Sequence, residues 1–141
     1  MIVSQTERLI IRLFELTDAM DYMRTGPMAS YEKFGFGLYV LELQGCHTPI
    51  GMCGLLKRDN LEYADLGFAL LPQFYRKGYA KEASLAVLTE ARDNYKLSKV
   101  SAVTALFNTG SNHLLTSLSF SYKEKIEFYQ QETNYYEIAL N

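Results

Sequence analysis

The stretch FYRKGYAKEA (residues 74–83) combines two cations with a glycine at the predicted start of a helix. The first N–H groups of a helix have no partner inside it and carry the positive end of its dipole, and Gly78 lets the backbone turn where other residues resist. Such a helix start is a backbone site for phosphate, with Arg76 and Lys77 adding charge at its rim. The same residues could also form a solvated cationic turn, and spacing alone leaves both interpretations open.

A second polar stretch, NTGSNHLLTSLSF (residues 108–120), follows the next predicted strand. Asn108 is a strong N-cap candidate for a short helix, Ser111 lies one turn in, and leucines form an apolar stripe. Two helix starts at the ends of consecutive strands, both facing one sheet edge, suit a long ligand with a phosphate at one end and polar amide groups behind it. Taken alone, Asn108 is a routine cap and Ser111 an ordinary first-turn serine.

The elements that hold these residues follow from the hydrophobic periodicity. Alternating or β-branched apolar runs predict strands at residues 6–14, 36–44, 49–58, 62–71, 99–106, 120–128 and 134–140. Recurrence at three- or four-residue steps predicts a helix over 79–95, and shorter helical segments are predicted over 18–25, over 28–33 and after Asn108. This order predicts an α/β protein with a mixed, mainly antiparallel sheet of about seven strands.

The composition is that of an ordinary globular domain. The 141 residues, 48% hydrophobic and 21% charged, predict one domain over 1–141 without a linker. A net charge of −2 and a pI near 5.7 argue against nucleic acid or an anionic membrane as the main partner. No run approaches the ~20 apolar residues of a membrane span, and the N-terminal sequence lacks a signal-peptide pattern.

The cysteines and histidines are too few to predict a disulfide framework or a metal site. Cys46 and Cys53 fit no common zinc spacing, and only His47 and His113 accompany them. We therefore predict no metal, and two free thiols in a reducing cytoplasm.

Taken together, three stretches resemble the GNAT superfamily of acyl-CoA-dependent N-acyltransferases, and most of all its branch of ribosomal-protein alanine N-acetyltransferases. TERLIIRLFELTDA (6–19) is similar to that branch's first strand and turn. ADLGFALLPQFYRKGYAKEA (64–83) looks like its fourth strand, pyrophosphate loop and main helix, and NTGSNHLLTSLSF (108–120) resembles its asparagine-to-LGF helix. Two residues depart from the pattern: Arg76 stands where the branch often has glycine, and Ser119 replaces the glycine of LGF.

The resemblance implies a GNAT-like fold in which the fourth and fifth strands splay apart and acetyl-CoA lies in the wedge. The pantetheine arm would pair with backbone at Phe68, Ala69 and Leu70, and a bulge there could supply the N–H for an oxyanion. Asn108 would hold the arm from the other side. The pyrophosphate would bind the amides of Arg76, Lys77, Gly78, Tyr79, Ala80 and Lys81.

Acyl transfer to an amine also needs a base for the amine and a group near the departing thiolate. Asp65 stands where this branch usually carries a glutamate, so the resemblance implies a base acting through a water; its alternative role is a strand-face carboxylate paired with Lys or Arg. Many members place a tyrosine acid at the position of Leu115, which cannot donate a proton. Ser111, where this branch can place a hydroxyl by the sulfur, is the nearest substitute.

The acceptor side departs furthest from the family pattern. Where the branch has two helices and a loop, residues 17–35 have room for little more than one helix and a turn. The acceptor site is then unusually open, completed by a second subunit in a homodimer, or lost. Tyr31 and Tyr39 could line what remains, although packing explains these tyrosines equally well.

Three functions stay open at this point. The leading prediction is an acetyl-CoA-dependent N-acetyltransferase whose acceptor is a primary amine, on a protein N-terminus or a small molecule. The alternative is a non-catalytic acyl-CoA-binding or regulatory module with a degenerate acceptor pocket. The third is an α/β interaction domain with no cofactor, which requires the loop resemblance to be accidental.

Overall fold

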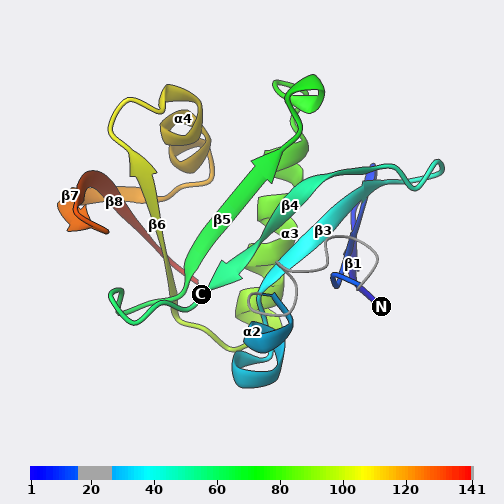
Figure 1. Ribbon diagram of the computed structural model, residues 1–141, viewed down its shortest axis with the longest axis horizontal. Helices are drawn as coiled ribbons and strands as arrows, with labels where there is room; N and C mark the ends of the chain where they lie inside the picture. The colour runs from blue at the N-terminus through cyan, green and yellow to red at the C-terminus, as the bar shows by residue number, and fades with distance from the viewer. Residues whose placement is uncertain (16–26, 141) are drawn as a thin grey trace.

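The computed structural model describes residues 1–15 and 27–140, which fold around one sheet of eight strands (Figure 1). The strands, in chain order, are β1 (Ile2–Gln5), β2 (Leu9–Arg12), β3 (Leu38–Leu43), β4 (Pro49–Leu56), β5 (Asp65–Leu70), β6 (Lys99–Ala105), β7 (Ser121–Phe128) and β8 (Gln131–Ala139). Their order across the sheet is β1-β2-β3-β4-β5-β6-β8-β7. The mixed, mainly antiparallel sheet predicted from the sequence is confirmed for this part of the chain.

The pairing of β5 with β6 differs from every other pairing among the described strands, because it is parallel and short. It has one registered position, Asp65 opposite Ser101. By contrast, β4 pairs with the whole length of β5, from Gly51–Leu70 to Leu56–Asp65, without a register shift, so the bulge expected near Phe68–Leu70 is absent from this ladder. Figure 1 shows β5 and β6 close together at one end and diverging toward the edge where both arrows end. The predicted splay therefore lies between β5 and β6.

The described helices are α2 (Pro27–Phe34), α3 (Tyr79–Asp93) and α4 (Thr109–Ser117), with a short 3-10 turn η1 (Pro72–Phe74) before α3. The long helix α3 crosses behind β4 and β5 (Figure 1). Its buried residues share one face because they recur at helical spacing: Ala83, Ser84, Val87, Leu88 and Ala91.

The strand register assigns side chains to two faces of the sheet. Cys53 Sγ lies 3.7 Å from Ser84 Oγ, so Cys53 points toward α3. Residues opposite each other in a ladder share a face, which places Tyr39 and Phe68 on the α3 side with Cys53. Asp65 has the other parity along β5 and faces away from α3. The core between the sheet and α3 therefore excludes the Asp65 carboxyl.

The predicted first strand, 6–14, is wrong in its bounds. Within it only Leu9–Arg12 (β2) is a strand, and residues 6–8 form a turn back to β1 (Ile2–Gln5), a strand that was not predicted. Thr6 N–H donates to Leu9 O at 2.9 Å, and Leu9 N–H donates to Thr6 Oγ1 at 3.0 Å. A threonine hydroxyl that accepts from a nearby backbone N–H closes a local turn in place of a ladder. The sheet consequently has eight strands where about seven were predicted.

The helical predictions have mixed outcomes. The segment predicted over 18–25 lies outside the described residues. The short helical segment predicted over 28–33 is the two-turn helix α2, and the long helix ends at Asp93 where 95 was predicted. The closing hairpin is confirmed as β7 and β8, paired antiparallel.

Both cysteines are free thiols, with Cys46 exposed and Cys53 buried. Burial raises the pKa of Cys53 to about 12, so this thiol stays protonated at neutral pH. Among the described residues, no helix is both long enough and apolar enough to cross a membrane.

Candidate functional site

The site begins where β5 and β6 separate. Ser101 N–H donates to Ala64 O at 2.8 Å, and Ser101 Oγ lies 3.2 Å from Tyr63 O, which closes one end of the gap between the strands. Beyond this point, the side of β5 that faces β6 has no registered partner in the described part of the chain. Phe68, Ala69 and Leu70 lie in this open half of β5. The backbone groups of Phe68 and Leu70 face the gap and can pair with an extended ligand, whereas those of Ala69 face β4.

The start of α3 follows directly from the open end of β5, through η1. Gly78 is the N-cap residue with a φ of +83°, and no side chain caps the helix. The first amide to donate along the helix is that of Glu82, to Gly78 O at 3.0 Å. The amides of residues 76–81 have no protein acceptor among the described residues, so they are available to an anion.

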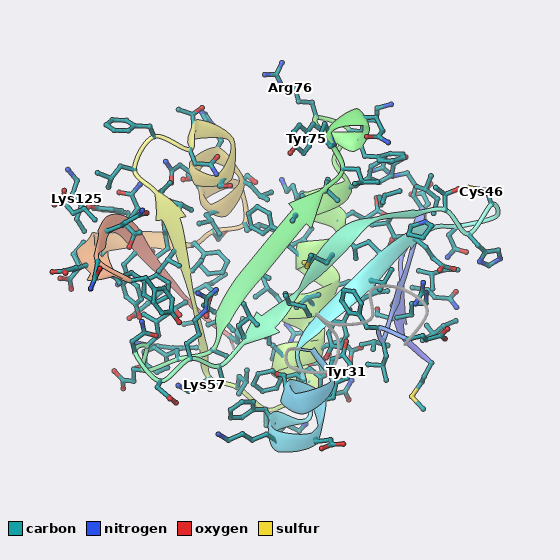
Figure 2. The ribbon with its side chains drawn as sticks, in the orientation of Figure 1. Tyr31, Cys46, Lys57, Tyr75, Arg76 and Lys125 are labelled. Carbon is teal, nitrogen blue, oxygen red and sulfur yellow. The ribbon has the colours of Figure 1, made fainter. Side chains whose placement is uncertain are left out.

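The side chains of the loop before α3 point into solvent and do not cover the free amides. Arg76 and Lys77 are exposed, and Tyr75 is 55% exposed; Figure 2 shows Tyr75 and Arg76 at the outer edge of the molecule. A Cβ added at Gly78 would lie 3.3 Å from Arg8 Nη2, so the glycine leaves room that another residue would restrict. Free amides, a left-handed glycine and rim cations fit a diphosphate group.

Two residues that stand in place of the family's glycines keep a backbone that favours glycine. Arg76 has a φ of +62° and Ser119 a φ of +74°. Non-glycine residues in this region carry a strain of order 1 kcal/mol each. The loop before α3 and the end of α4 therefore each contain a position whose backbone conformation glycine would adopt with less strain.

The start of α4 lies across the gap from α3, at the same edge of the sheet (Figure 1). The predicted cap is confirmed: Asn108 Oδ1 accepts from Ser111 N–H at 3.1 Å. The Asn108 Nδ2 group is left to donate elsewhere. The half-buried Ser111 hydroxyl has no partner within the described part of the chain, so it is free to meet a ligand.

Sequence reasoning missed Asn112, which anchors α4 to the sheet. Its Oδ1 accepts from Thr104 Oγ1 at 2.5 Å, from Tyr136 OH at 2.9 Å and from Asn134 Nδ2 at 3.3 Å. The available signal was its position in the helix: Asn112 lies three residues before Leu115 and so on the same, core-facing side of α4. Leu115 itself is fully buried, so a ligand in the gap does not reach this position.

Asp65 lies at the closed end of the gap and is 1% exposed. Its Oδ1 lies 3.2 Å from Arg58 Nε but makes no aligned hydrogen bond with any described residue. Burial raises the pKa of Asp65 to about 6, against the opposing effect of the Arg58 charge. The Arg58 guanidinium in turn lies 5.0 Å from the centre of the Phe128 ring. A carboxyl with this pKa can accept a proton near neutral pH.

Tyr31 and Tyr39 are not brought together with Asp65. Tyr39 is 1% exposed on the α3 side of the sheet, and its hydroxyl lies 2.7 Å from that of Tyr95. Tyr31 stacks on Tyr39 with ring centres 5.6 Å apart, and its hydroxyl donates to Leu38 O. Burial raises the pKa of the Tyr39 hydroxyl, which keeps it neutral. In this structure both tyrosines pack the core, and Tyr39 has almost no surface for an acceptor.

No group of three or more His, Cys, Asp or Glu side chains in the described part of the chain could hold a metal ion. The polar groups at the site include the backbone amides of residues 76–81, the Asn108 side-chain amide, the Ser111 hydroxyl and the Asp65 carboxyl.

Comparison with known proteins agrees with this geometry. Residues 15–121 match the family described as the Acetyltransferase (GNAT) domain, and the chain belongs to this family. No curated protein sequence matches the chain significantly.

Solved structures share the fold at low sequence identity. An acetyltransferase from Agrobacterium tumefaciens str. C58 superposes with a TM-score of 0.85 at 20% identity, over 96% of this chain and 92% of that one. The ribosomal-protein-S5-alanine acetyltransferase of Vibrio fischeri gives 0.78 at 15% identity, over 98% and 96%. A dodecameric spermidine N-acetyltransferase of Vibrio cholerae gives 0.77 at 17% identity, over 96% and 95%. The fold is thus that of GNAT acetyltransferases.

Proposed function

We propose that the protein transfers the acetyl group of acetyl-CoA to a primary amine, by direct attack of the amine on the thioester. The observation that carries this proposal is the gap between β5 and β6, which is closed at Asp65–Ser101 and has two helix starts across its open edge. A gap with strand backbone on one wall and free amides at its mouth suits a long ligand with a diphosphate.

Each part of acetyl-CoA has a matching surface in this proposal. The pantetheine arm pairs with the free backbone groups of Phe68 and Leu70, on either side of Ala69, which supports an extended arm in the manner of an added strand. The diphosphate binds the amides of residues 76–81, where the dipole of α3 favours negative charge. Asn108 Nδ2 donates to the arm from the α4 side.

The residues of the chain then serve the transfer, for which acetyl-CoA supplies an activated acetyl group as its thioester. Asp65 accepts a proton from the ammonium form of the acceptor through a water, because its raised pKa makes it a base near neutral pH. A backbone N–H in the Phe68–Leu70 stretch stabilises the negative charge that develops on the carbonyl oxygen. When the C–S bond breaks, the second proton that the amine nitrogen loses passes to the departing sulfur, toward which the Ser111 hydroxyl donates, so CoA leaves as the thiol.

A second candidate is a non-catalytic module that binds acyl-CoA. It is favoured by the full burial of Leu115, by the burial of Tyr39 and by the ion pair that Arg58 makes with Asp65. In this case the gap and the start of α3 keep their binding role, while Asp65 is a structural partner of Arg58.

Calorimetric titration with acetyl-CoA, followed by a panel of amines assayed for release of free CoA thiol, tests both candidates. The panel includes a peptide with N-terminal alanine and spermidine, because solved structures of this fold include enzymes named for these substrate types. Binding with turnover supports the acetyltransferase. Binding without turnover on any amine supports the module, and no binding contradicts both.

A further inference from the structure

The turn between β1 and β2 holds the first turn of α3 from outside the gap. Glu82, in that first turn, accepts from Thr6 Oγ1 and, at 3.0 Å, from Arg8 N–H. Its Oε1 pairs with Arg8 Nε at 2.8 Å. The Arg8 guanidinium also lies 4.3 Å from the centre of the Tyr79 ring. A segment near the N-terminus thus contacts the helix start that carries the free amides.

One of these contacts fixes the direction of a peptide group. Arg8 Nη1 donates to Lys77 O at 2.9 Å. The carbonyl of a trans peptide points opposite to the N–H of the next residue, so a Lys77 carbonyl held toward Arg8 turns the Gly78 N–H away from it. Glycine populates both signs of φ readily, so this contact limits the orientations open to the peptide.

Arg8 also compensates the charge of Glu82. Burial alone would raise the pKa of the Glu82 carboxyl, but the hydrogen bonds from Thr6 and Arg8 outweigh it, so the pKa lies below its ordinary value. An ionised carboxylate within one turn of the free amides would repel a diphosphate. The close guanidinium offsets that repulsion and leaves the positive end of the helix to the ligand.

We propose that Arg8 is a positioning residue for the diphosphate of acetyl-CoA. It orients the Gly78 amide through the Lys77 carbonyl and neutralises Glu82. The inference rests on the proposed function, because it assumes that the amides of residues 76–81 bind the diphosphate.

The test compares Arg8→Met with Arg92→Met. Arg92 is an exposed arginine in the last turn of the same helix, paired with Asp93 at 2.8 Å, and so controls for loss of a surface cation. We expect CoA to bind Arg8→Met about ten-fold more weakly by calorimetry, since one charge-assisted contact and one charge compensation are lost. Arg92→Met should bind CoA as the wild type does. In spectra of ¹⁵N-labelled protein, the Gly78 amide should shift less on saturation with CoA in Arg8→Met.

A folded Arg8→Met that binds CoA within about two-fold of the wild type overturns the inference. If Arg8→Met does not fold, Arg8→Lys replaces it. A single ammonium keeps the charge but does not bond Glu82 and the Lys77 carbonyl together, so binding about three-fold weaker is expected and wild-type affinity overturns the inference. If the wild-type protein itself binds no CoA, the proposed function fails, and the inference about Arg8 fails with it. Binding by the wild type with no loss in Arg8→Met overturns the inference alone.

Discussion

The N-termini of α3 and α4 occupy equivalent positions at the open edge of the sheet, but they are capped in different ways. α3 begins at Gly78, which has a φ of +83° and no side-chain cap, and α4 begins at Asn108, whose side chain accepts from Ser111 N–H. The first amides of α3 are left without a side-chain acceptor and are available to a ligand, whereas in α4 the Ser111 amide is bonded by the helix's own N-cap residue. A single residue type at the N-cap therefore decides which helix start is an open anion site.

The division of work in the site follows from this difference. In the proposed function the α3 side binds through its backbone amides, so its chemistry is charge complementarity to a diphosphate. The α4 side offers side-chain groups, Asn108 Nδ2 and the Ser111 hydroxyl, which suit amide and sulfur atoms along the arm. At the closed end, Asp65 is the buried carboxyl that can exchange a proton.

The largest effect is expected from closing the open helix start. Gly78→Asp places a carboxylate among the free amides and beside Arg8, and we expect it to weaken CoA binding by about 100-fold or more in a calorimetric titration. Gly45→Asp is the matched control, because Gly45 has a similar φ of +87° and nothing within 4 Å of an added Cβ. Equal losses in both variants would attribute the effect to backbone strain and contradict the assignment.

The next effect concerns the carboxyl at the closed end. Asp65→Asn removes the proposed base, and we expect kcat/KM for the amine to fall about 100-fold with acetyl-CoA affinity unchanged. In the wild type, kcat/KM should rise with pH up to about 6, as Asp65 loses its proton, and this limb should be absent in the variant. An unchanged profile would assign Asp65 to structure alone.

The same variant has a separate signature in stability. The Asp65 pKa is about 6 in the folded protein against an ordinary 3.8, so the folded state binds this proton more tightly than the unfolded state. Wild-type stability relative to Asp65→Asn should therefore fall as pH rises from about 4 to about 6, by up to about 3 kcal/mol, and stay level above. Denaturant unfolding at several pH values measures this difference, and a rise with pH would contradict it.

A smaller effect is expected at the closed helix start. Asn108→Ala removes the cap of α4 and should cost about 1 kcal/mol of unfolding free energy. Asn108→Ser keeps a capping oxygen but loses the Nδ2 donor, so it should retain stability while both variants bind CoA a few-fold more weakly, by about 1 kcal/mol. Wild-type CoA affinity in Asn108→Ser would exclude the Nδ2 contact.

The smallest effect is expected at the rim of the open helix start. Arg76→Gly relieves a φ of +62° and adds chain entropy to the unfolded state, so the two changes nearly cancel within about 1 kcal/mol. CoA affinity should stay within about three-fold, because the backbone does the binding. A loss beyond about ten-fold would show that the Arg76 charge itself binds the phosphates.

Much of the α3 side could be predicted from sequence, because its signals are local. A glycine between cations ahead of an amphipathic run indicates a helix start with free amides, and Asn108 indicates a cap. The turn at residues 6–8, which separates β1 from β2, was missed because a threonine hydroxyl closes it and no glycine or proline marks it.

The environments of the other site residues depend on contacts between distant segments. Burial of Tyr39 on the α3 side follows from strand register, which periodicity alone does not give. Arg8 and Glu82 are remote in sequence, so their ion pair has no local signal. The Arg58–Asp65 pair depends on the conformation of the loop between β4 and β5. Asn112 carried a usable signal, since an asparagine in a leucine stripe needs polar partners when it is buried.

The central claim concerns which amides meet the diphosphate. Titration of ¹⁵N-labelled protein with CoA, followed by amide NMR, reads residues 76–81 and Ser111 in one experiment. The account predicts large shifts across 76–81 at the start of α3 and a small one at Ser111, whose N–H already donates to Asn108. Binding of CoA that leaves the amides of 76–81 unshifted would contradict it.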